Sequence, residues 1–266
     1  WSNLLKPFKK SDVVPILRLE GVISTGGRFG GGINDQNLSL LIEKAFKVPR
    51  SKAVALIINS PGGSPAQSSL IASRIRRLAE DKELPVIAFC EDVAASGGYW
   101  LACAADEIFA DENSIIGSIG VISAGFGFHE LLSRQGVERR IYTSGEEKSM
   151  LDPFLPERDE DIKRLRAIQK AIHTNFKRYV SERRGIRIEG KNIFTGEVWE
   201  SRRAIELGLI DGLGHIEPIL KQRFGEKIKF KKMEKKRPFF SRLGVSFLKN
   251  LNEAVVNKLS FSRFGL

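Results

Sequence analysis

Residues 53–64 read AVALIINSPGGS, and residues 85–99 read PVIAFCEDVAASGGY. Each stretch begins with a short run of apolar, often β-branched residues, which is typical of a buried strand, and ends in a turn of glycine and other small residues. A helix predicted over 68–78 lies between them, with its apolar residues on one face. Strand, glycine turn, helix and strand form a βαβ unit, so the sequence predicts an α/β fold with parallel strands.

The same alternation continues along the chain. We expect further strands at residues 13–19, 107–110 and 138–142, and helices at residues 96–105, 131–136 and 157–184. The last helix should bury an apolar stripe, because its apolar residues recur with helical spacing. They are Ile162, Leu165, Ile168, Ile172, Phe176 and Val180.

Length, composition and charge limit the possible domain organisation and partners. A chain of 266 residues, 42% of them hydrophobic, is long enough for one α/β domain with an appendage. Cys90 and Cys103 lie in apolar stretches and are expected to be buried free thiols. The net charge is +11, but residues 221–266 hold 13 Lys and Arg against 3 Asp and Glu. The body is therefore nearly neutral, which argues against a nucleic-acid-binding body.

The two glycine turns carry the candidate chemistry. Consecutive strands of a parallel sheet end at the same edge, where ligands bind. The N–H groups of Gly63 and Gly97 could then face a carbonyl oxygen under attack by Ser96, as an oxyanion hole does. Taken singly, each turn could also be an ordinary βα connection, and Ser96 could be only a helix N-cap.

A serine nucleophile needs a base. His129, His173 and His215 are present, but none stands in a supporting motif. A lysine serves as a base when burial or a neighbouring positive charge lowers its pKa. The residue types alone do not select one lysine.

Several segments, in order and spacing, resemble signal peptide peptidase A and related peptidases of family S49. The resemblance runs from about residue 13 to about residue 219. The segments are 59–64 (NSPGGS), 95–99 (ASGGY), 116–122 (IGSIGVI), 144–149 (SGEEKS) and 204–211 (AIELGLID).

This resemblance implies residue roles. Ser96 matches the family nucleophile, Lys148 its base, Ser118 a serine that orients the base, and Gly63 an oxyanion glycine. Two features depart from the pattern: residues 195–201 read TGEVWES where the family has Gly-Arg-Val-Trp-x-Gly, and two glutamates precede Lys148. Carboxylates close to the amine would raise its pKa, so we expect the side chains of Glu146 and Glu147 to face solvent.

The resemblance also implies an architecture, namely an α/β spiral of ββα repeats of the Clp/crotonase type. We divide the chain into an N-terminal extension (1–12), a catalytic domain (13–220) and a basic amphipathic tail (221–266). Family members form rings or domes, so a homo-oligomer is expected. Peptides are the expected substrates, above all remnant signal peptides or other unfolded apolar segments. No metal or other cofactor is implied.

Three alternatives stay open. A crotonase-type acyl-CoA-binding protein shares the fold, but a serine at position 96 has no purpose in enolate chemistry. A Clp-type Ser-His-Asp peptidase should carry a histidine in residues 115–122, where there is none. A non-catalytic scaffold is the third, although Ser96 and Lys148 are both present.

The tail suggests a location. It joins a basic run at residues 227–237 to a segment, 241–261, in which apolar residues recur every four positions. A helix of that kind would bind an anionic membrane surface. Disorder, docking on a neighbouring subunit and nucleic-acid binding are the alternatives. We expect association with the bacterial cytoplasmic membrane, on a side that the sequence does not show. The chain opens on Trp1, which leaves room for a preceding anchor.

Overall fold

The computed structural model describes residues 11–25, 32–145, 147–234, 258 and 260–264. The strands are β1 (Val13–Glu20), β2 (Val54–Ser60), β3 (Val86–Ala95), β4 (Glu107–Ala110), β5 (Ile115–Gly117), β6 (Val198–Glu200), β7 (Gly212–Leu213) and β8 (Lys229–Lys232). The helices are α1 (Asp35–Phe46), α2 (Pro65–Lys82), α3 (Gly97–Ala102), α4 (His129–Arg134), α5 (Asp159–Arg184), α6 (Ser201–Glu206) and α7 (Ile216–Phe224), and a 3-10 turn covers Gly185–Ile188.

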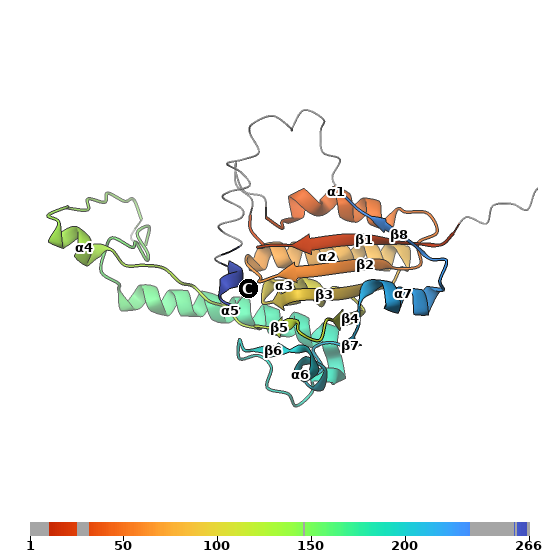
Figure 1. Ribbon diagram of the computed structural model, residues 1–266. Helices are drawn as coiled ribbons and strands as arrows, with labels where there is room; N and C mark the ends of the chain where they lie inside the picture. Colours follow the sequence, from red (N-terminus) through yellow and green to blue (C-terminus); the bar gives the residue numbers. More distant parts are fainter. Residues whose placement is uncertain (1–10, 26–31, 146, 235–257, 259, 265–266) are drawn as a thin grey trace, which may run out of the picture.

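These strands form an eight-stranded sheet in the order β6-β5-β3-β2-β1-β8, with β4 paired to β3 and β7 paired to β4 (Figure 1). Every pair is parallel except β5 with β6. The predicted βαβ unit is present as β2, α2 and β3. The α/β prediction with a parallel-dominated sheet is therefore confirmed.

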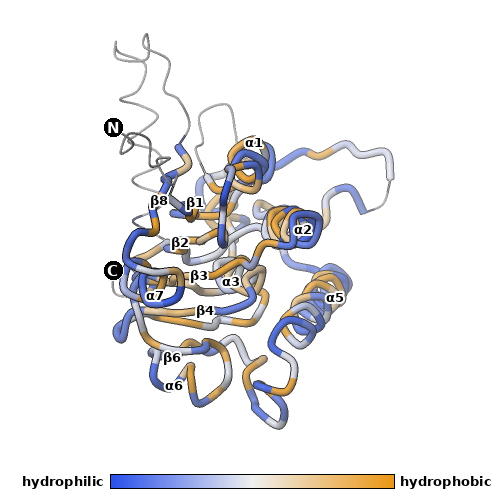
Figure 2. The backbone as a smooth tube through the Cα atoms, turned by 90° about the vertical axis from the view of Figure 1, so that its right-hand side faces the viewer, coloured by the Kyte–Doolittle hydropathy of each residue, from blue (hydrophilic) through white to orange (hydrophobic). Residues whose placement is uncertain are grey.

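Helices cover both faces of the sheet. Viewed from the side, α1, α2 and α5 lie to one side of the strands and α7 to the other (Figure 2). The larger core packs α1, α2, α3 and the end of α5 against the strands, through residues such as Ile42, Ile71 and Phe176. The smaller core lies under α7, where Leu220 contacts the opposite face of β2 and β3.

Strand β3 positions the central turn. Its first half pairs with β4, from Ile87 to Cys90, and its second half pairs with β5, from Val93 to Ala95. The strand is thus longer than the predicted 85–90, because it changes partner midway. It delivers the chain directly to Ser96 at the start of α3, which is shorter than the predicted helix 96–105.

Residues 121–157, which we call the arm, project beyond the end of the sheet (Figure 1). The predicted short helix is present as α4, but the predicted strand at 138–142 is wrong: these residues carry no strand. A strand needs a hydrogen-bonded neighbour. The backbone hydrogen bonds recorded for the arm are local turn and helix contacts, apart from Phe128 N–H to the Pro153 carbonyl at 2.6 Å.

The C-terminal segment only partly follows the predicted division. Helix α7 runs past residue 220, and β8 joins the sheet beside β1, so residues up to 232 belong to the folded body. Most of the amphipathic segment predicted at 241–261 lies outside the described residues.

Within the described part of the chain, no helix is long and apolar enough to cross a bilayer.

Candidate active site

Ser96 occupies a strained turn between β3 and α3. Its φ of 52° and ψ of −118° lie outside the regions that non-glycine residues favour, at a cost of roughly 1–3 kcal/mol. Its backbone is held at both sides, since its N–H donates to the Gly117 carbonyl at 2.8 Å and its carbonyl accepts from Trp100 N–H at 3.0 Å. A strained serine between a strand and a helix is the arrangement of a nucleophile elbow.

The Ser96 hydroxyl is not used as a helix cap. Ser96 stands at the N-cap position of α3, yet its side chain makes no capping hydrogen bond. No hydrogen bond of this hydroxyl to any described residue is recorded, and the residue is half-buried. The N-cap interpretation of Ser96 therefore loses its support, and the hydroxyl remains available for chemistry.

The second glycine turn packs directly against Ser96. Gly62 is buried at φ 103°, and a Cβ added to it would lie 2.8 Å from both the Ser96 Cβ and the Gly97 N. A Cβ added to Gly97 would lie 3.4 Å from the Gly63 N. The structure thus brings together Ser96, Gly63 and Gly97, as the sequence predicted, and adds Gly62 as the glycine that permits the approach.

Gly63 presents a free donor. The bridge between residues 23 and 63 uses Ile23 N–H to the Gly62 carbonyl and Ser64 N–H to the Ile23 carbonyl, both at 2.8 Å. This pattern leaves the Gly63 N–H without a partner among the described residues, and Gly63 is exposed. An unpaired backbone N–H in the glycine turn that packs against the candidate nucleophile is what an oxyanion hole requires.

Sequence reasoning missed the residues that support this turn. The Ser60 hydroxyl donates to the Gly21 carbonyl at 2.7 Å and accepts from Gly62 N–H at 3.2 Å. Buried Ser68, in α2, lies behind Gly97, with its Oγ 2.5 Å from the position of an added Cβ. Both serines lie in or close to the glycine motif at residues 59–64, and this closeness in sequence could have identified them.

Ser118 follows β5, one residue after the Gly117 carbonyl that holds the Ser96 N–H. It is 7% exposed, and like Ser96 it has a φ of 52°, which is a strained conformation for any residue other than glycine. Its N–H donates to the Glu197 carbonyl at 2.6 Å, which ties it to the segment before β6. Ser118 therefore follows directly the residue whose carbonyl holds the Ser96 N–H.

Lys148 lies elsewhere. It is exposed on the arm, in the turn that precedes α5, and its side chain has no recorded hydrogen bond or ion pair within the described residues. The arm's side-chain hydrogen bonds run within the arm or to the start of α5. The structure thus does not bring Lys148 to Ser96 within one chain.

The neighbouring carboxylate does not pair with the lysine. Glu147 is exposed, as expected, but it contacts two arginines, with Oε2 3.2 Å from Arg158 Nη2 and a shorter contact to Arg164 Nη1. Glu146 lies outside the described residues.

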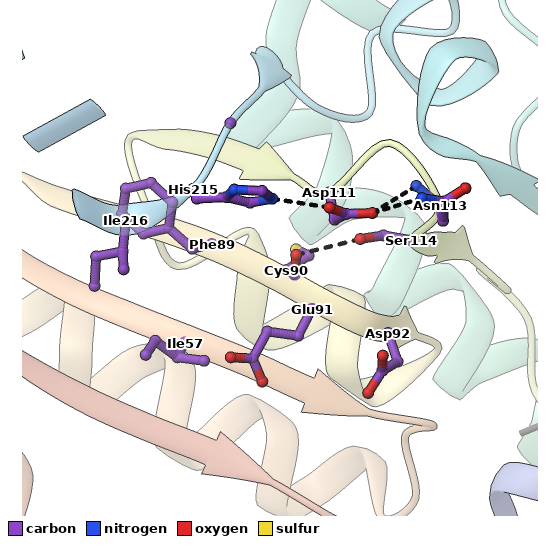
Figure 3. A pocket seen from close by; sticks show the side chains of 11 residues that line it. Ile57, Phe89, Cys90, Glu91, Asp92, Asp111, Asn113, Ser114, His215 and Ile216 are labelled. Carbon is purple, nitrogen blue, oxygen red and sulfur yellow. Dashed lines mark hydrogen bonds and ion pairs between the residues drawn. The ribbon is translucent and has the colours of Figure 1, made fainter. Parts of the chain in front are cut away.

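None of the three histidines forms a hydrogen bond with Ser96 among the described residues. His129 begins α4 on the arm, His173 contacts the Ile119 carbonyl at 3.0 Å, and His215 Nε2 lies 2.8 Å from Asp111 Oδ2. His215 and Asp111 line a cavity of about 400 Å³ beside α7 (Figure 3). Ser96 is not among the lining residues, so this cavity is separate from the candidate site.

The two cysteines are buried and free, as expected. Burial raises the pKa of Cys103 to about 12 and raises that of Cys90 as well, so both thiols stay protonated. No group of three or more potential metal ligands is found among the described residues.

A parallel α/β sheet with a strained serine between a strand and a helix, faced by a second glycine turn, defines a protein of the serine-hydrolase type. The sequence comparisons agree. The model of peptidase family S49 matches residues 78–226, more than half of the chain. The chain belongs to peptidase family S49.

Individual relatives support this assignment. A putative signal peptide peptidase SppA of Enterococcus faecium is 31% identical over 195 residues, covering 73% of this chain and 56% of that protein. The chloroplastic serine protease SPPA of Arabidopsis thaliana is 33% identical over 215 residues, covering 76% and 31%.

A Brucella abortus protein named as the Na⁺/H⁺ antiporter NhaA is 48% identical over 231 residues, covering 86% of this chain but 31% of that protein. The chain thus spans between 31% and 56% of the length of these relatives. The transport name describes a protein that is mostly outside the match, so it assigns nothing to this chain.

Proposed function

We propose that this chain is a serine endopeptidase that uses Ser96 as its nucleophile and Lys148 as its general base. The observation that carries the proposal is the Ser96 turn: a strained backbone, a hydroxyl without a recorded partner, and an unpaired Gly63 N–H beside it. Membership of a peptidase family supports it. A crotonase-type or scaffold role would leave this strain without a use.

The proposed mechanism has two steps. Neutral Lys148 accepts the Ser96 proton as Oγ attacks a peptide carbonyl, and the developing oxyanion accepts hydrogen bonds from Gly63 and Gly97 N–H. The lysine then gives the proton to the leaving amine, and a water molecule hydrolyses the acyl-enzyme. Ser118 orients the lysine amine in this scheme.

The base must come from another copy of the chain. Lys148 is exposed on the projecting arm, and the arm also exposes apolar side chains, including Phe126 at 81% and Tyr142 at 92%. Exposed apolar patches mark interfaces. Docking of the arm on a neighbouring subunit would bury these side chains and carry Lys148 toward that subunit's Ser96. The expected ring or dome thereby gains a catalytic purpose.

The substrate class follows from the same assembly. We propose remnant signal peptides or other unfolded apolar segments near the membrane, because only an extended chain could enter a site formed between subunits. The Clp/crotonase-type spiral and an anionic membrane contact through the basic tail complete this proposal. The likeness to signal peptide peptidases supports the substrate class.

Labelling with a fluorophosphonate probe tests the nucleophile. The wild-type protein should be labelled and should hydrolyse a fluorogenic peptide, whereas Ser96→Ala should do neither. Lys148→Ala and Lys148→Arg should both be folded and inactive, because a guanidinium group cannot act as a base. Full activity of Lys148→Arg would overturn the base assignment, and labelling of Ser96→Ala would overturn the nucleophile.

A further inference from the structure

Four charged side chains fix the turn that carries Lys148 to the start of α5. Arg158 Nη2 lies 2.8 Å from Asp161 Oδ1 and 3.2 Å from Glu147 Oε2, and Arg164 Nη1 contacts the same two carboxylates. Two arginines thus bridge one carboxylate in the Lys148 turn to one carboxylate in the first turn of the helix. Such a network restrains geometry better than an isolated surface pair.

Asp161 also holds the backbone of the turn. It is 3% exposed, and its Oδ2 accepts from Leu151 N–H at 3.4 Å and from Arg158 Nε at 3.0 Å. Leu151 has a φ of 57°, which costs energy for a residue with a side chain. A strained residue persists where the surroundings determine its conformation. The Asp161 carboxylate contributes one such restraint through the Leu151 N–H.

Charge neutralisation explains why Glu147 tolerates its position. A glutamate next to a general-base lysine would hold that lysine protonated if the two side chains paired. Arg158 and Arg164 instead occupy the carboxylate. The hydrogen bonds from Arg158 likewise hold the pKa of Asp161 below its usual range, so this carboxylate stays ionised and the network stays intact.

We propose that Glu147 is a positioning residue for Lys148: through Arg158, Arg164 and Asp161 it clamps the turn against α5 and so fixes the point from which the Lys148 amine reaches the serine. This proposal rests on the proposed function. The residue acts through the lysine and has no contact with substrate.

The variant Glu147→Gln tests it in the full-length protein, with hydrolysis of a fluorogenic peptide as the readout. A base displaced by about 1 Å loses on the order of 10²-fold in rate. The expected result is therefore a fall in kcat of roughly 10- to 100-fold with KM unchanged, since substrate binding does not use the clamp. Glu138→Gln is the matched control, because Glu138 is an exposed arm glutamate paired with Arg140. It should keep wild-type kcat.

A double-mutant cycle separates positioning from a general loss of structure. Arg164→Gln should lower kcat less than Glu147→Gln, because Arg158 still joins the two carboxylates. The double variant should lose little more than Glu147→Gln alone, because both substitutions act on the same network. Thermal unfolding and sedimentation should match the wild-type protein. Additive losses, or a raised KM with wild-type kcat, would overturn the proposal.

Lys148→Ala distinguishes the clamp from the mechanism. If Lys148→Ala is inactive while Glu147→Gln has the same kcat as Glu138→Gln, the clamp is refuted and the proposed base stands. Wild-type activity in Lys148→Ala would refute the base, and the clamp with it. In the supporting outcome, Lys148→Ala is inactive and Glu147→Gln shows the kcat loss described above.

Discussion

The sheet body buries its large apolar side chains, whereas the arm leaves many of them exposed. In the body, the Trp100 ring stacks on Phe176 and on Tyr179, with ring centroids 4.6 Å and 5.4 Å apart. Arg184, 2% exposed, is paired by Asp211 and the Gly208 carbonyl. In the arm, Phe126, Phe128 and Phe154 cluster with one another but remain partly or largely exposed. The body completes its own core, whereas the arm has the surface of an interface.

Helix α5 belongs to both regions and shows the change along its length. The apolar stripe predicted for it continues over the whole helix, but only Phe176 and Val180 in its C-terminal half are buried apolar residues. Ile168, nearer the arm, is 52% exposed. The sequence therefore encodes an apolar face longer than the body covers, and the proposed assembly would cover the rest of it.

The largest expected effect comes from mixing two inactive variants. Ser96→Ala retains its arm and Lys148, and Lys148→Ala retains its Ser96 turn, so subunits of the two can complete each other's site if the site lies between copies. Random head-to-tail assembly of an equal mixture leaves about a quarter of the interfaces with both groups intact. Peptidase activity should therefore rise from background to about a quarter of the wild-type level.

The same mixing experiment carries its own control. A chain that carries both substitutions should stay inactive when mixed with either single variant, because one of the two groups is then missing from every subunit. Absence of any activity in the first mixture, under conditions where sedimentation shows mixed oligomers, would place both groups of a working site in one chain.

A second prediction tests the body's side of the site. In Gly62→Ala, the added methyl would lie 2.8 Å from the Ser96 Cβ and would strain a backbone at φ 103°. We expect kcat/KM to fall on the order of 10²-fold through displacement of the nucleophile. Peptide hydrolysis measures the loss, and circular dichroism should show an unchanged fold. Wild-type kcat/KM would show that the two turns are not packed as described.

Stability should separate the two regions. Arg184→Met takes the buried main partner from half-buried Asp211, and breaking a buried pair costs up to roughly 3–5 kcal/mol of unfolding free energy. Arg140→Met removes an exposed arm pair and should cost about 0–1 kcal/mol. Urea unfolding of both variants measures the difference. Equal costs would contradict the distinction between a closed body and an open arm.

A smaller effect is expected from acid. Burial alone would raise the pKa of Asp211, but the hydrogen bonds and charge of Arg184 outweigh it, so the pKa is lowered. A lowered folded-state pKa gives stability that is complete above the unfolded value, about 3.9, and is lost as pH falls through the folded value. The stability advantage of the wild-type protein over Asp211→Asn should thus be constant from pH 5 to 7, roughly a unit above that unfolded value, and shrink below about pH 4. A constant difference at pH 3 would contradict this assignment.

Much of the body could be predicted from the sequence because local patterns there agree with the fold. The runs that became β1, β2 and β4 are apolar and β-branched, and the turns at Gly62 and Gly97 punctuate them. Helix α1 was missed, although Asn34 caps it by accepting from Asn37 N–H at 2.8 Å. Strand β6 was also missed, because three residues carry too short a pattern to distinguish a strand from a loop.

The candidate site divides in the same way. Residues 62–63 and 96–97 could be placed together because parallel strands end at one edge. The strand predicted at 138–142 is absent because no strand in the described part of the chain pairs with these residues. Lys148 came from family resemblance, and its distance from Ser96 along the fold could not be read from a spacing of residues.

The length of α5 sets a spacing between catalytic groups. Its 26 residues span about 39 Å at 1.5 Å per residue. Near one end it is fixed to the body by the stack of Phe176 and Tyr179 on Trp100, four residues after Ser96, and at the other it carries the clamped Lys148 turn. In the proposed assembly, the length of this helix sets the distance between Ser96 of one subunit and Ser96 of the neighbouring subunit that uses its Lys148. Each residue inserted into it would move the amine by 1.5 Å and rotate it by about 100°, so the helix length fixes the distance between neighbouring sites around the ring.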